Sequence, residues 1–424
     1  MMTEKLLQFL WRFQYFNKEA LTTTNGESLF ILQQGLHNQH QGPDFQEATV
    51  TIGSTQWTGN IEIHIRSSDW LQHKHTADAH YANIILHVVW QHDTDVQDIH
   101  GNTLMVLELQ DKVPKVLIER YIQLMLSPII PCQNKALPAL DELAWTSWKE
   151  RLAAERLERK AAKVLAYHTE SNHHWEEVFW WMLASNFGMK VNAELFEHVA
   201  RTLPIHLLAR HKNALTQLEA LLFGQANLLN GHFTGEYPLL LQREYLFLQG
   251  KYQLLSQPFQ PLNLRMRPAN LPGVRLAQLA MLVYRSEHLF ATIRESENMS
   301  VVYQLFDVAA SGYWNTHYLF DKAGEHCEKR IGRETVNSII INTIVPVLFA
   351  YGMYQQNEYY KSKAIRWLMQ TGYENNSIVQ GWKGLGQKSK TALDSQAFTE
   401  LTNMYCNEKR CLECAVGVNI LRKL

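Results

Sequence analysis

The chain has 424 residues, with 40 basic and 41 acidic side chains and a formal net charge of −1. This length exceeds what one ordinary hydrophobic core supports, so it suggests two or three domains. The balanced charge excludes an overall electrostatic attraction to nucleic acid or to a membrane, although it leaves a local basic surface open. A composition of 46% hydrophobic and 19% charged residues is typical of a globular protein and excludes an intrinsically disordered chain.

The first 115 residues combine one helical pattern with several strand patterns. Apolar residues at helical spacing predict a helix within residues 1–20. Period-two alternation and short apolar runs predict strands at residues 28–34, 48–53, 57–65, 83–90 and 103–110. A polar stretch at residues 67–81 is expected to form a short helix or loop between the third and fourth of these strands. This order predicts an α/β domain built on a mixed sheet.

After Pro114 the apolar pattern changes to a helical period. The longest helix is expected within residues 144–168, where charged side chains stand three and four positions apart. Further helical patterns lie at residues 175–187, 193–202, 215–229 and 236–255, and they resume at 274 after a proline-rich connector. We therefore predict an α/β domain at residues 1–115 followed by a large all-α region, divided into helical domains at 116–257 and 258–424.

The sequence has no pattern that predicts export or membrane insertion. Glu4, Lys5 and Arg12 interrupt a short apolar region near the N-terminus, which argues against an export signal. The longest apolar run, residues 338–354, is shorter than the roughly 20 residues that cross a bilayer, and we predict a buried helix broken at Pro346. We therefore expect no membrane partner and a cytoplasmic protein whose five cysteines stay reduced.

Acidic residues in the N-terminal domain form a pattern that suits a divalent cation. Asp44 follows a Gly-Pro turn, and Glu62 and His64 alternate on the predicted strand 57–65, so these two side chains share one face. Carboxylates bind Mg²⁺ or Mn²⁺, and such a cation activates water and neutralises charge on a phosphate. Asp44, Glu62 and His64 are therefore the candidate catalytic residues. The alternative is an ordinary Gly-Pro-Asp turn beside a solvent-facing strand edge.

Pro43-Asp44, Glu62-x-His64 and the order of elements over residues 1–110 resemble the PD-(D/E)XK nuclease superfamily. The resemblance implies a restriction-endonuclease-like domain, nucleic acid as the partner, and cleavage of phosphodiester bonds in DNA or RNA. It also implies that Asp44 and Glu62 bind the metal and that His64 positions or activates water. His64 stands where the superfamily has lysine, however, and a neutral imidazole supplies no fixed positive charge. The domain is therefore either an active nuclease or an inactive relic of one.

The polar connection holds a second set of candidate metal ligands. His73 and His75 are two positions apart, so an extended chain would place both imidazoles on one side, a spacing that transition-metal sites use. Asp69 or Asp78 could complete a set of two histidines and one carboxylate. The alternative is a polar connection whose histidines bond to strand edges. His87 lies inside an apolar run and is expected to be a satisfied core histidine.

Three of the five cysteines fall within nine residues of one another. Cys406, Cys411 and Cys414 have a spacing that suits Zn²⁺ or an iron–sulfur cluster. A fourth ligand would come from Cys132, Cys327 or a histidine. Cys132, at the junction that leaves the α/β domain, completes the predicted set. The alternative is a group of buried thiols that bind no metal.

Basic residues in two loops form a candidate surface for phosphates. These residues are Arg265, Arg267, Arg275, Lys383, Lys388 and Lys390. Ordinary solvated connectors are the alternative interpretation.

A second resemblance extends over the whole chain. Its motifs are similar to those of an uncharacterised bacterial family known only as a domain of unknown function, and they lie at residues 38–45, 59–64, 68–70, 85–89, 265–268 and 405–414. The resemblance implies a self-contained unit of about this length, but it implies no activity and no site residues.

Three hypotheses about function follow from these patterns. The leading one is a divalent-metal-dependent nuclease, with Asp44, Glu62 and His64 at its centre. The second is a non-catalytic binding or scaffold protein with a helical interaction surface. The third is a transition-metal hydrolase built on His64, His73 and His75.

Overall fold

The structure is a computed structural model that describes residues 2–38, 41–127, 130, 132, 140–255, 261–263 and 266–422. The chain divides into two compact units. The first combines Met1–Trp145 with Leu401–Leu424, and the second is Thr146–Glu400. The predicted domain boundaries at residues 115 and 257 stay a prediction, because a unit defined by contacts need not coincide with a domain.

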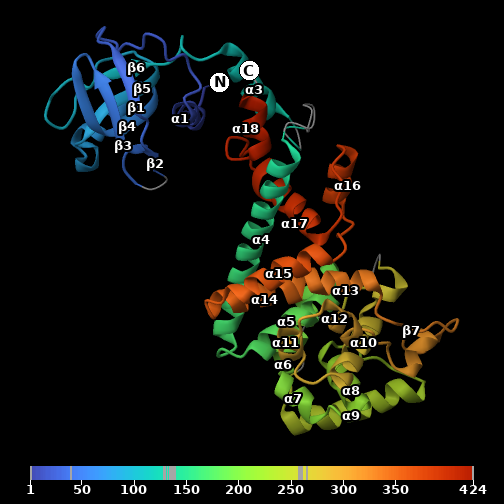
Figure 1. Cartoon of the computed structure of the whole chain (residues 1–424). Helices are drawn as coiled ribbons and strands as arrows, with labels where there is room; N and C mark the ends of the chain where they lie inside the picture. The colour runs from blue at the N-terminus through green and yellow to red at the C-terminus, as the bar shows by residue number, and fades with distance from the viewer. Residues whose placement is uncertain are drawn as a thin grey trace. The chain divides into compact units, whose positions relative to one another are not determined.

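The N-terminal unit is built on a six-stranded mixed sheet (Figure 1). Its strands are β1 (Leu29–Gln33), β2 (Leu36–His37), β3 (Phe45–Ile52), β4 (Thr55–Arg66), β5 (Ile84–Gln91) and β6 (Val106–Glu108). The hydrogen-bonded order is β1-β3-β4-β5-β6, with β2 also paired to β3. The neighbours β1, β3 and β4 are antiparallel, whereas β4, β5 and β6 are parallel. The predicted mixed sheet is therefore confirmed.

Local sequence explains these strand directions. Gly53 has a φ of 61° in the two-residue turn between β3 and β4, a left-handed conformation that glycine adopts without steric penalty. The parallel step from β4 to β5 needs a crossover, which α2 (Asp69–Gln72) and two short 3-10 turns supply. Gly59 allows these strands to meet closely, because a Cβ there would lie 2.5 Å from Ile85 Cγ2.

Segments from opposite ends of the sequence complete the N-terminal unit. Near its start, α1 (Glu4–Phe13) packs against β4, and later α3 (Lys115–Leu126) packs against α18 (Ala415–Arg422). A π-helical segment, Leu401–Cys406, precedes α18. The guanidinium of Arg422 lies 4.9 Å from the centre of the Phe13 ring, so the last helix also contacts the first.

The second unit is mostly helical, which confirms the predicted helical region. Its helices are α4 (Glu142–Glu170), α5 (Trp175–Phe187), α6 (Met189–Thr202), α7 (Ile205–Arg210), α8 (Leu215–Gln225), α9 (Glu236–Tyr252), α10 (Pro272–Arg285), α11 (Leu289–Glu295), α12 (Met299–Leu305), α13 (Arg333–Ile339), α14 (Val345–Tyr354), α15 (Glu358–Gln370), α16 (Ser377–Gly384) and α17 (Ala392–Glu400). The strands β7 (His317–Leu319) and β8 (Lys322–Ala323) form a small separate sheet that the sequence did not predict. One hydrophobic core joins these helices, with Phe223, Trp314 and Trp367 among its fully buried side chains.

The apolar run at residues 338–354 forms a buried helix, but the predicted break at Pro346 is wrong. A π-helical segment, Ile340–Ile344, connects α13 directly to α14. The wider turn relieves the clash between the proline ring and the preceding carbonyls, so the chain stays helical through Pro346. Among the described residues, Arg333–Tyr354 is the one helical stretch long and apolar enough to span a membrane, yet 72% of its most apolar window is buried inside the protein. It has the burial of a core helix.

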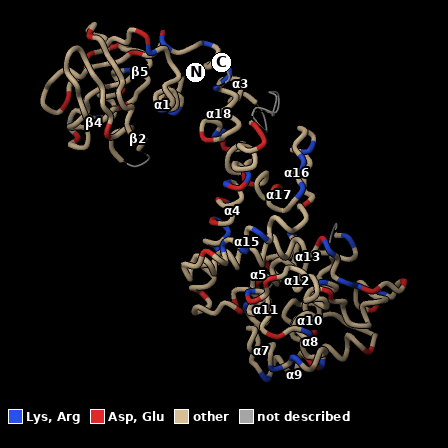
Figure 2. Tube along the Cα trace, in the orientation of Figure 1, with Lys and Arg blue, Asp and Glu red and all other residues tan. Residues whose placement is uncertain are grey.

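Charged side chains of both signs are interspersed along α4 (Figure 2). Lys149 Nζ lies 2.6 Å from Asp394 Oδ1, and Arg156 Nη1 lies 3.4 Å from Glu400 Oε2. These ion pairs join α4 to α17 within the second unit. Some of the oppositely charged side chains therefore form ion pairs between two helices that are far apart in the sequence.

Candidate metal centre

Asp44 and Glu62 lie side by side where the start of β3 meets the middle of β4. The backbone N–H of Asp44 donates to Glu62 Oε2 at 3.0 Å, and the N–H of Ile63 donates to Asp44 Oδ2 at 3.1 Å. From α1, Gln8 Nε2 donates to Asp44 Oδ1 at 2.8 Å. These reciprocal bonds hold both carboxylates at one place on the sheet, as the turn and the strand alternation suggested.

Both carboxylates are withdrawn from solvent, Glu62 fully and Asp44 in large part. Burial raises the pKa of Asp44, against the opposing effect of the hydrogen bonds from Gln8 and Ile63. Burial also raises the pKa of Glu62, and the neighbouring Asp44 carboxylate adds to that rise. Without a cation, the two adjacent carboxyl groups resist ionisation. A bound divalent cation would stabilise both of them as carboxylates.

Three histidines lie close together, and two of them face Oε1 of Glu62. His64 Nε2 lies 3.0 Å from His73 Nδ1, and one ring nitrogen from each of His64, His73 and His75 lies within 4.8 Å of the other two. Glu62 Oε1 lies 3.7 Å from His64 Nε2 and 3.5 Å from His75 Nε2. Nitrogen ligands at ~2.0–2.1 Å from a tetrahedral zinc ion are about 3.3 Å apart. The separations among the three histidine nitrogens therefore suit ligands of a single ion, and Glu62 lies beside two of them.

The buried histidines are held neutral, which is the form that binds metal. Burial lowers the pKa of His64 and His87, and it lowers the pKa of His75 to about 4. His64 Nδ1 lies 2.8 Å from His87 Nε2, so this contact leaves His64 Nε2 directed toward His73. A ligating imidazole is commonly fixed through its second nitrogen in this way. His87 therefore lies next to the ligand set, although its sequence suggested only a core position.

One buried nitrogen lacks a hydrogen-bond partner at the place where a cation would bind. Within the described part of the chain, His75 Nε2 and His87 Nδ1 are buried and have no such partner. A buried polar atom without a partner carries a desolvation penalty. For His75 Nε2, which faces Glu62, a bound cation would remove that penalty. A donor set of three imidazoles beside carboxylates suits Mn²⁺ or Zn²⁺ better than Mg²⁺, which prefers oxygen ligands.

The crossover loop delivers its two histidines by a turn instead of an extended chain. Lys74 adopts a left-handed conformation with a φ of 61°, which reverses the chain between His73 and His75. The Trp70 ring is fully buried, and its centre lies 5.2 Å from that of His75. The spacing therefore predicted both histidines, but a turn, and not an extended chain, brings His75 to Glu62 and His73 to His64.

The carboxylates of the crossover loop itself have other partners. Asp69 Oδ2 accepts the backbone N–H of Arg66 at 2.8 Å, and Asp78 Oδ1 lies 2.8 Å from His80 Nδ1. Asp78 lies near enough to His75 to raise its pKa slightly against the effect of burial, but neither carboxylate belongs to the group of ligand atoms that the three histidines form. The carboxylate that faces His64 and His75 is that of Glu62.

The cysteines separate into one group and one outlier. Cys132, Cys406, Cys411 and Cys414 are buried free thiols of the N-terminal unit, whereas Cys327 is exposed in the second unit. The structure thus brings the four predicted ligands into one unit and leaves the fifth cysteine apart.

The predicted basic surface is only partly available to a phosphate. Arg275 is buried, and its guanidinium donates to Gln278 Oε1 at 3.0 Å and to Asn270 Oδ1 at 2.6 Å, so its assignment to the surface was wrong. Arg265 lies outside the described residues. The lysines of the same predicted surface are exposed, and these are Lys383, Lys388 and Lys390.

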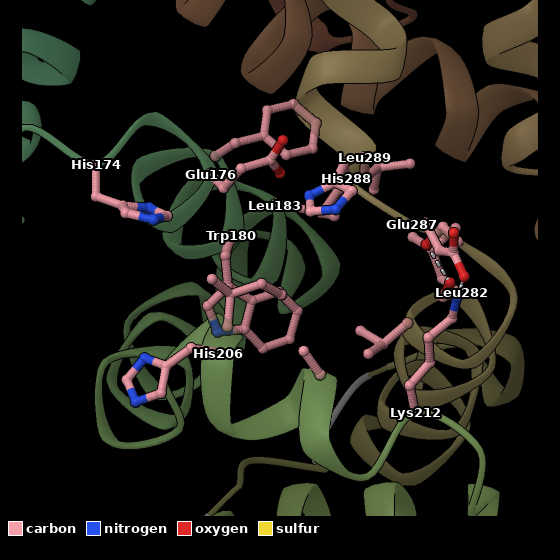
Figure 3. A pocket seen from close by; sticks show the side chains of 15 residues that line it. His174, Glu176, Trp180, Leu183, His206, Lys212, Leu282, Glu287, His288 and Leu289 are labelled. Atoms are coloured by element: carbon pink, nitrogen blue, oxygen red, sulfur yellow. Dashed lines mark hydrogen bonds and ion pairs between the residues drawn. The ribbon is translucent and has the colours of Figure 1, made fainter.

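A cavity of about 500 Å³ lies in the helical unit (Figure 3). Its wall is largely apolar and includes Trp180 and Leu289. The carboxylate of Glu176 at its edge accepts the backbone N–H groups of Phe290 and Ala291, at 3.2 Å and 2.9 Å. None of the predicted site residues lines this cavity. The sequence did not reveal it, because its lining comes from separate helices whose apolar positions look like ordinary core.

Residues 4–377 match the family described as "Protein of unknown function (DUF2851)". The chain belongs to this family. The matched range contains the sheet, both carboxylates and the three histidines, and it ends before the cysteines at residues 406–414. No curated protein and no solved structure matches the chain. The predicted membership of a family of unknown function is confirmed, and the resemblance to nucleases stays a hypothesis.

Proposed function

We propose that this protein is a metal-dependent hydrolase that cleaves phosphodiester bonds in DNA or RNA. The observation that carries the proposal is the meeting of Asp44 and Glu62 with three histidines at one place on the mixed sheet. The order of the elements also supports it. A helix, a set of antiparallel strands, a crossover and a parallel strand form the arrangement that the restriction-endonuclease-like resemblance implies.

Asp44 and Glu62 would hold the cation together with the histidines beside them. When bound, the cation neutralises charge on a phosphate and makes water a stronger acid. We expect Mn²⁺ or Zn²⁺ to support activity better than Mg²⁺, because imidazole nitrogen is a softer ligand than carboxylate or water oxygen.

The replacement of the superfamily lysine by His64 has a consequence for the positive charge at this site. His64 is buried and neutral, so it can orient water but cannot neutralise a phosphate. His73 is the exposed member of the histidine set, and the exposed Lys74 follows it. A phosphate that approaches from the His73 side would therefore meet the Lys74 ammonium.

Cleavage assays on the full-length protein test this proposal. Metal-free protein would be supplied with Mn²⁺, Zn²⁺ or Mg²⁺ and mixed with single- or double-stranded DNA or RNA. We expect cleavage by the wild type and a loss of at least 100-fold in His73→Ala, with lower metal content. His80→Ala changes an exposed histidine of the same loop and should keep the activity. A wild type that cuts none of these substrates with any of the cations would contradict the proposal.

The histidine set supports a second candidate, a transition-metal hydrolase that acts on another class of bond. In this case His64, His73 and His75 hold the cation without help from Asp44. Metal analysis of two variants separates the candidates. Zinc or manganese that is lost in His73→Ala but kept in Asp44→Ala, in a protein that hydrolyses an activated carboxylic ester and no phosphodiester, would favour the second candidate.

The scaffold hypothesis receives weaker support. It expected an exposed apolar helix face together with dispersed site residues. Leu246 and Phe247 on α9 are more than half exposed, at 65% and 63%, but Asp44 and Glu62 are gathered rather than dispersed. We also propose a cytoplasmic location, which the free state of all five cysteines supports.

A further inference from the structure

Four buried cysteines of the N-terminal unit lie on segments that come from opposite ends of the sequence. Cys132 follows α3, Cys406 is the last residue of the π-helical segment, and Cys411 and Cys414 precede α18. Their exposed fractions are only 5–7%, and none of them forms a disulfide. The polypeptide therefore buries four reduced sulfurs in one unit, on segments that are far apart in the sequence.

Packing of the backbone holds these segments together. Helices α3 and α18 are in contact, and Lys409 Nζ donates a hydrogen bond to the carbonyl oxygen of Ser127, shortly before Cys132. Gly417 lies so close to the preceding turn that a Cβ there would stand 2.2 Å from the Cys411 carbonyl oxygen. Glycine at this position therefore keeps the turn that carries Cys411 and Cys414 tight.

The four sulfurs are close enough to influence one another. Burial raises the pKa of Cys406, and the sulfurs of Cys414, Cys132 and Cys411 add to the rise. Burial raises the pKa of Cys411 to about 12, with further contributions from Cys414 and Cys132. Without a cation these thiols would stay protonated and would make few hydrogen bonds.

Two features of the site suit sulfur in its anionic form. Burial raises the pKa of Cys414, but the backbone N–H groups of Val416 and Gly417 hydrogen-bond to its sulfur and oppose that rise. The Lys409 ammonium likewise opposes the burial that raises the pKa of Cys406 and Cys411, so a positive charge lies near the group. Buried thiols that served only as apolar packing would need neither feature.

We propose that Cys132, Cys406, Cys411 and Cys414 hold an iron–sulfur cluster that fastens the C-terminal segment to α3. This centre is independent of the histidine site and has a structural role. Each cysteine would bind through its thiolate, since cluster iron is held by deprotonated sulfur.

Sulfur spacing favours a cluster over a single zinc ion. Four cysteines on one zinc have sulfurs about 3.8 Å apart. Among the described residues, three ligand atoms lie within 4.8 Å of one another only in the histidine set. No three of the four cysteine sulfurs are therefore that close together. A four-iron cluster separates its cysteines further, because each sulfur binds a different iron.

The test is metal and sulfide analysis of the full-length protein purified without oxygen. We expect iron and acid-labile sulfide in stoichiometric amounts, together with broad visible absorbance that reduction by dithionite bleaches. Serine substitution of each of Cys132, Cys406, Cys411 and Cys414 should lower the bound iron at least several-fold. Cys327→Ser is the matched control, because this cysteine is exposed and belongs to the other unit, so iron and absorbance should stay unchanged.

The wild-type protein alone decides the main point, so the proposal does not depend on whether the variants fold. Stoichiometric zinc in place of iron, or neither metal in protein purified without oxygen, would overturn it. So would full iron content in the Cys406→Ser variant. His73→Ala should keep its iron and its visible absorbance, and a failure of the hydrolase proposal would leave this result unchanged.

Discussion

The two carboxylate oxygens of Glu62 have different neighbours, so a substitution at this residue can test metal binding separately from folding. Oε2 accepts the backbone N–H of Asp44, whereas Oε1 faces His64 and His75. A glutamine at this position would keep the shape of the side chain and remove its charge. The substitution therefore separates the need for a ligand from the need for a folded strand.

We predict opposite effects of Glu62→Gln on metal binding and on the stability of the metal-free protein. Affinity for Mn²⁺ or Zn²⁺ should fall by at least the roughly 10–100-fold that is typical of changes around a metal ligand. The metal-free protein should become more stable near neutral pH, because burial disfavours the charged carboxylate. Isothermal titration calorimetry and thermal unfolding measure the two effects. Equal metal affinity of variant and wild type would remove Glu62 from the ligand set.

Glu219 on α8 provides a pH-dependent contribution to the stability of the helical unit. It is 1% exposed and accepts hydrogen bonds from the Tyr237 hydroxyl at 2.8 Å and the Ser311 hydroxyl at 2.7 Å. Burial nevertheless raises its pKa from 4.5 to about 7. The folded state thus favours the protonated acid, so this stabilisation is complete below pH 4.5 and is lost as the pH rises through about 7.

Glu219→Gln should remove this pH dependence. At pH 8 the variant should have a free energy of unfolding about 3 kcal/mol above that of the wild type, and at pH 4 the two should be alike. Thermal unfolding between pH 4 and pH 8 measures the difference. Glu325→Gln, at an exposed position, is the control. Parallel pH profiles for wild type and Glu219→Gln would contradict the prediction.

Individual site residues were predictable to different degrees. Period-two alternation on one strand was enough to place Glu62 and His64 together, and the Gly-Pro turn suggested that Asp44 would join them. The approach of His75 was not predictable in detail, because it depends on the left-handed conformation of Lys74. Such a conformation at a lysine has no sequence pattern of its own.

Close contact between α8 and α9 depends on a single missing side chain. A Cβ on Gly224 would lie 2.1 Å from the Tyr245 ring, and the Tyr245 hydroxyl is held by Gln225 Nε2 at 2.9 Å. The ring therefore has little freedom to move away. A Cβ built on Gly250 of α9, by contrast, would have no atom within 4 Å, apart from its chain neighbours and its own helix backbone.

Gly224→Ala and Gly250→Ala should consequently have opposite effects. We expect Gly224→Ala to destabilise the helical unit by about 1–3 kcal/mol through overpacking. Gly250→Ala should stabilise it by about 0.5–1 kcal/mol, because alanine restricts the unfolded chain and favours the helix. Calorimetric unfolding of both variants tests the pair. A stabilised Gly224→Ala would show that the two helices can separate without penalty.

Elements with strong local periodicity were the most predictable. The helix expected at residues 144–168 is α4 (Glu142–Glu170), and the strand expected at 83–90 is β5 (Ile84–Gln91). Elements that depend on distant partners were not. Strand β2 spans only Leu36–His37 and exists through its pairing with β3, and the π-helical turn before Pro346 reflects packing that periodicity does not encode.

The N-terminal unit as a whole is discontinuous in sequence, and this could not be predicted. It needs Leu401–Leu424 in addition to Met1–Trp145. Periodicity shows that a segment is a helix, but it does not show which core will bury that helix. Only the cysteine spacing hinted that residues near 132 and near 410 belong together.

Truncation after Glu400 should therefore destabilise the N-terminal unit and not the helical unit that directly precedes the removed residues. Without α18, the face of α3 that packs against it becomes exposed, and α1 loses the contact of Phe13 with Arg422. We expect faster hydrogen exchange in α1 and α3 and unchanged exchange in α8 and α10 of the helical unit. Hydrogen exchange followed by mass spectrometry measures both. Equal protection of α1 and α3 in the full and truncated chains would contradict the discontinuous unit.

The discontinuity also sets an order of events during synthesis. A ribosome makes the chain from its N-terminus, so the sheet that carries Asp44 and Glu62 emerges first and the segment at residues 401–424 follows only after the whole helical unit. At about 5–20 residues per second, this interval lasts roughly 10–50 s. Throughout that time the nascent sheet domain lacks one of its own helices. The helical unit can fold within the interval, and the N-terminal unit becomes complete last although its synthesis began first.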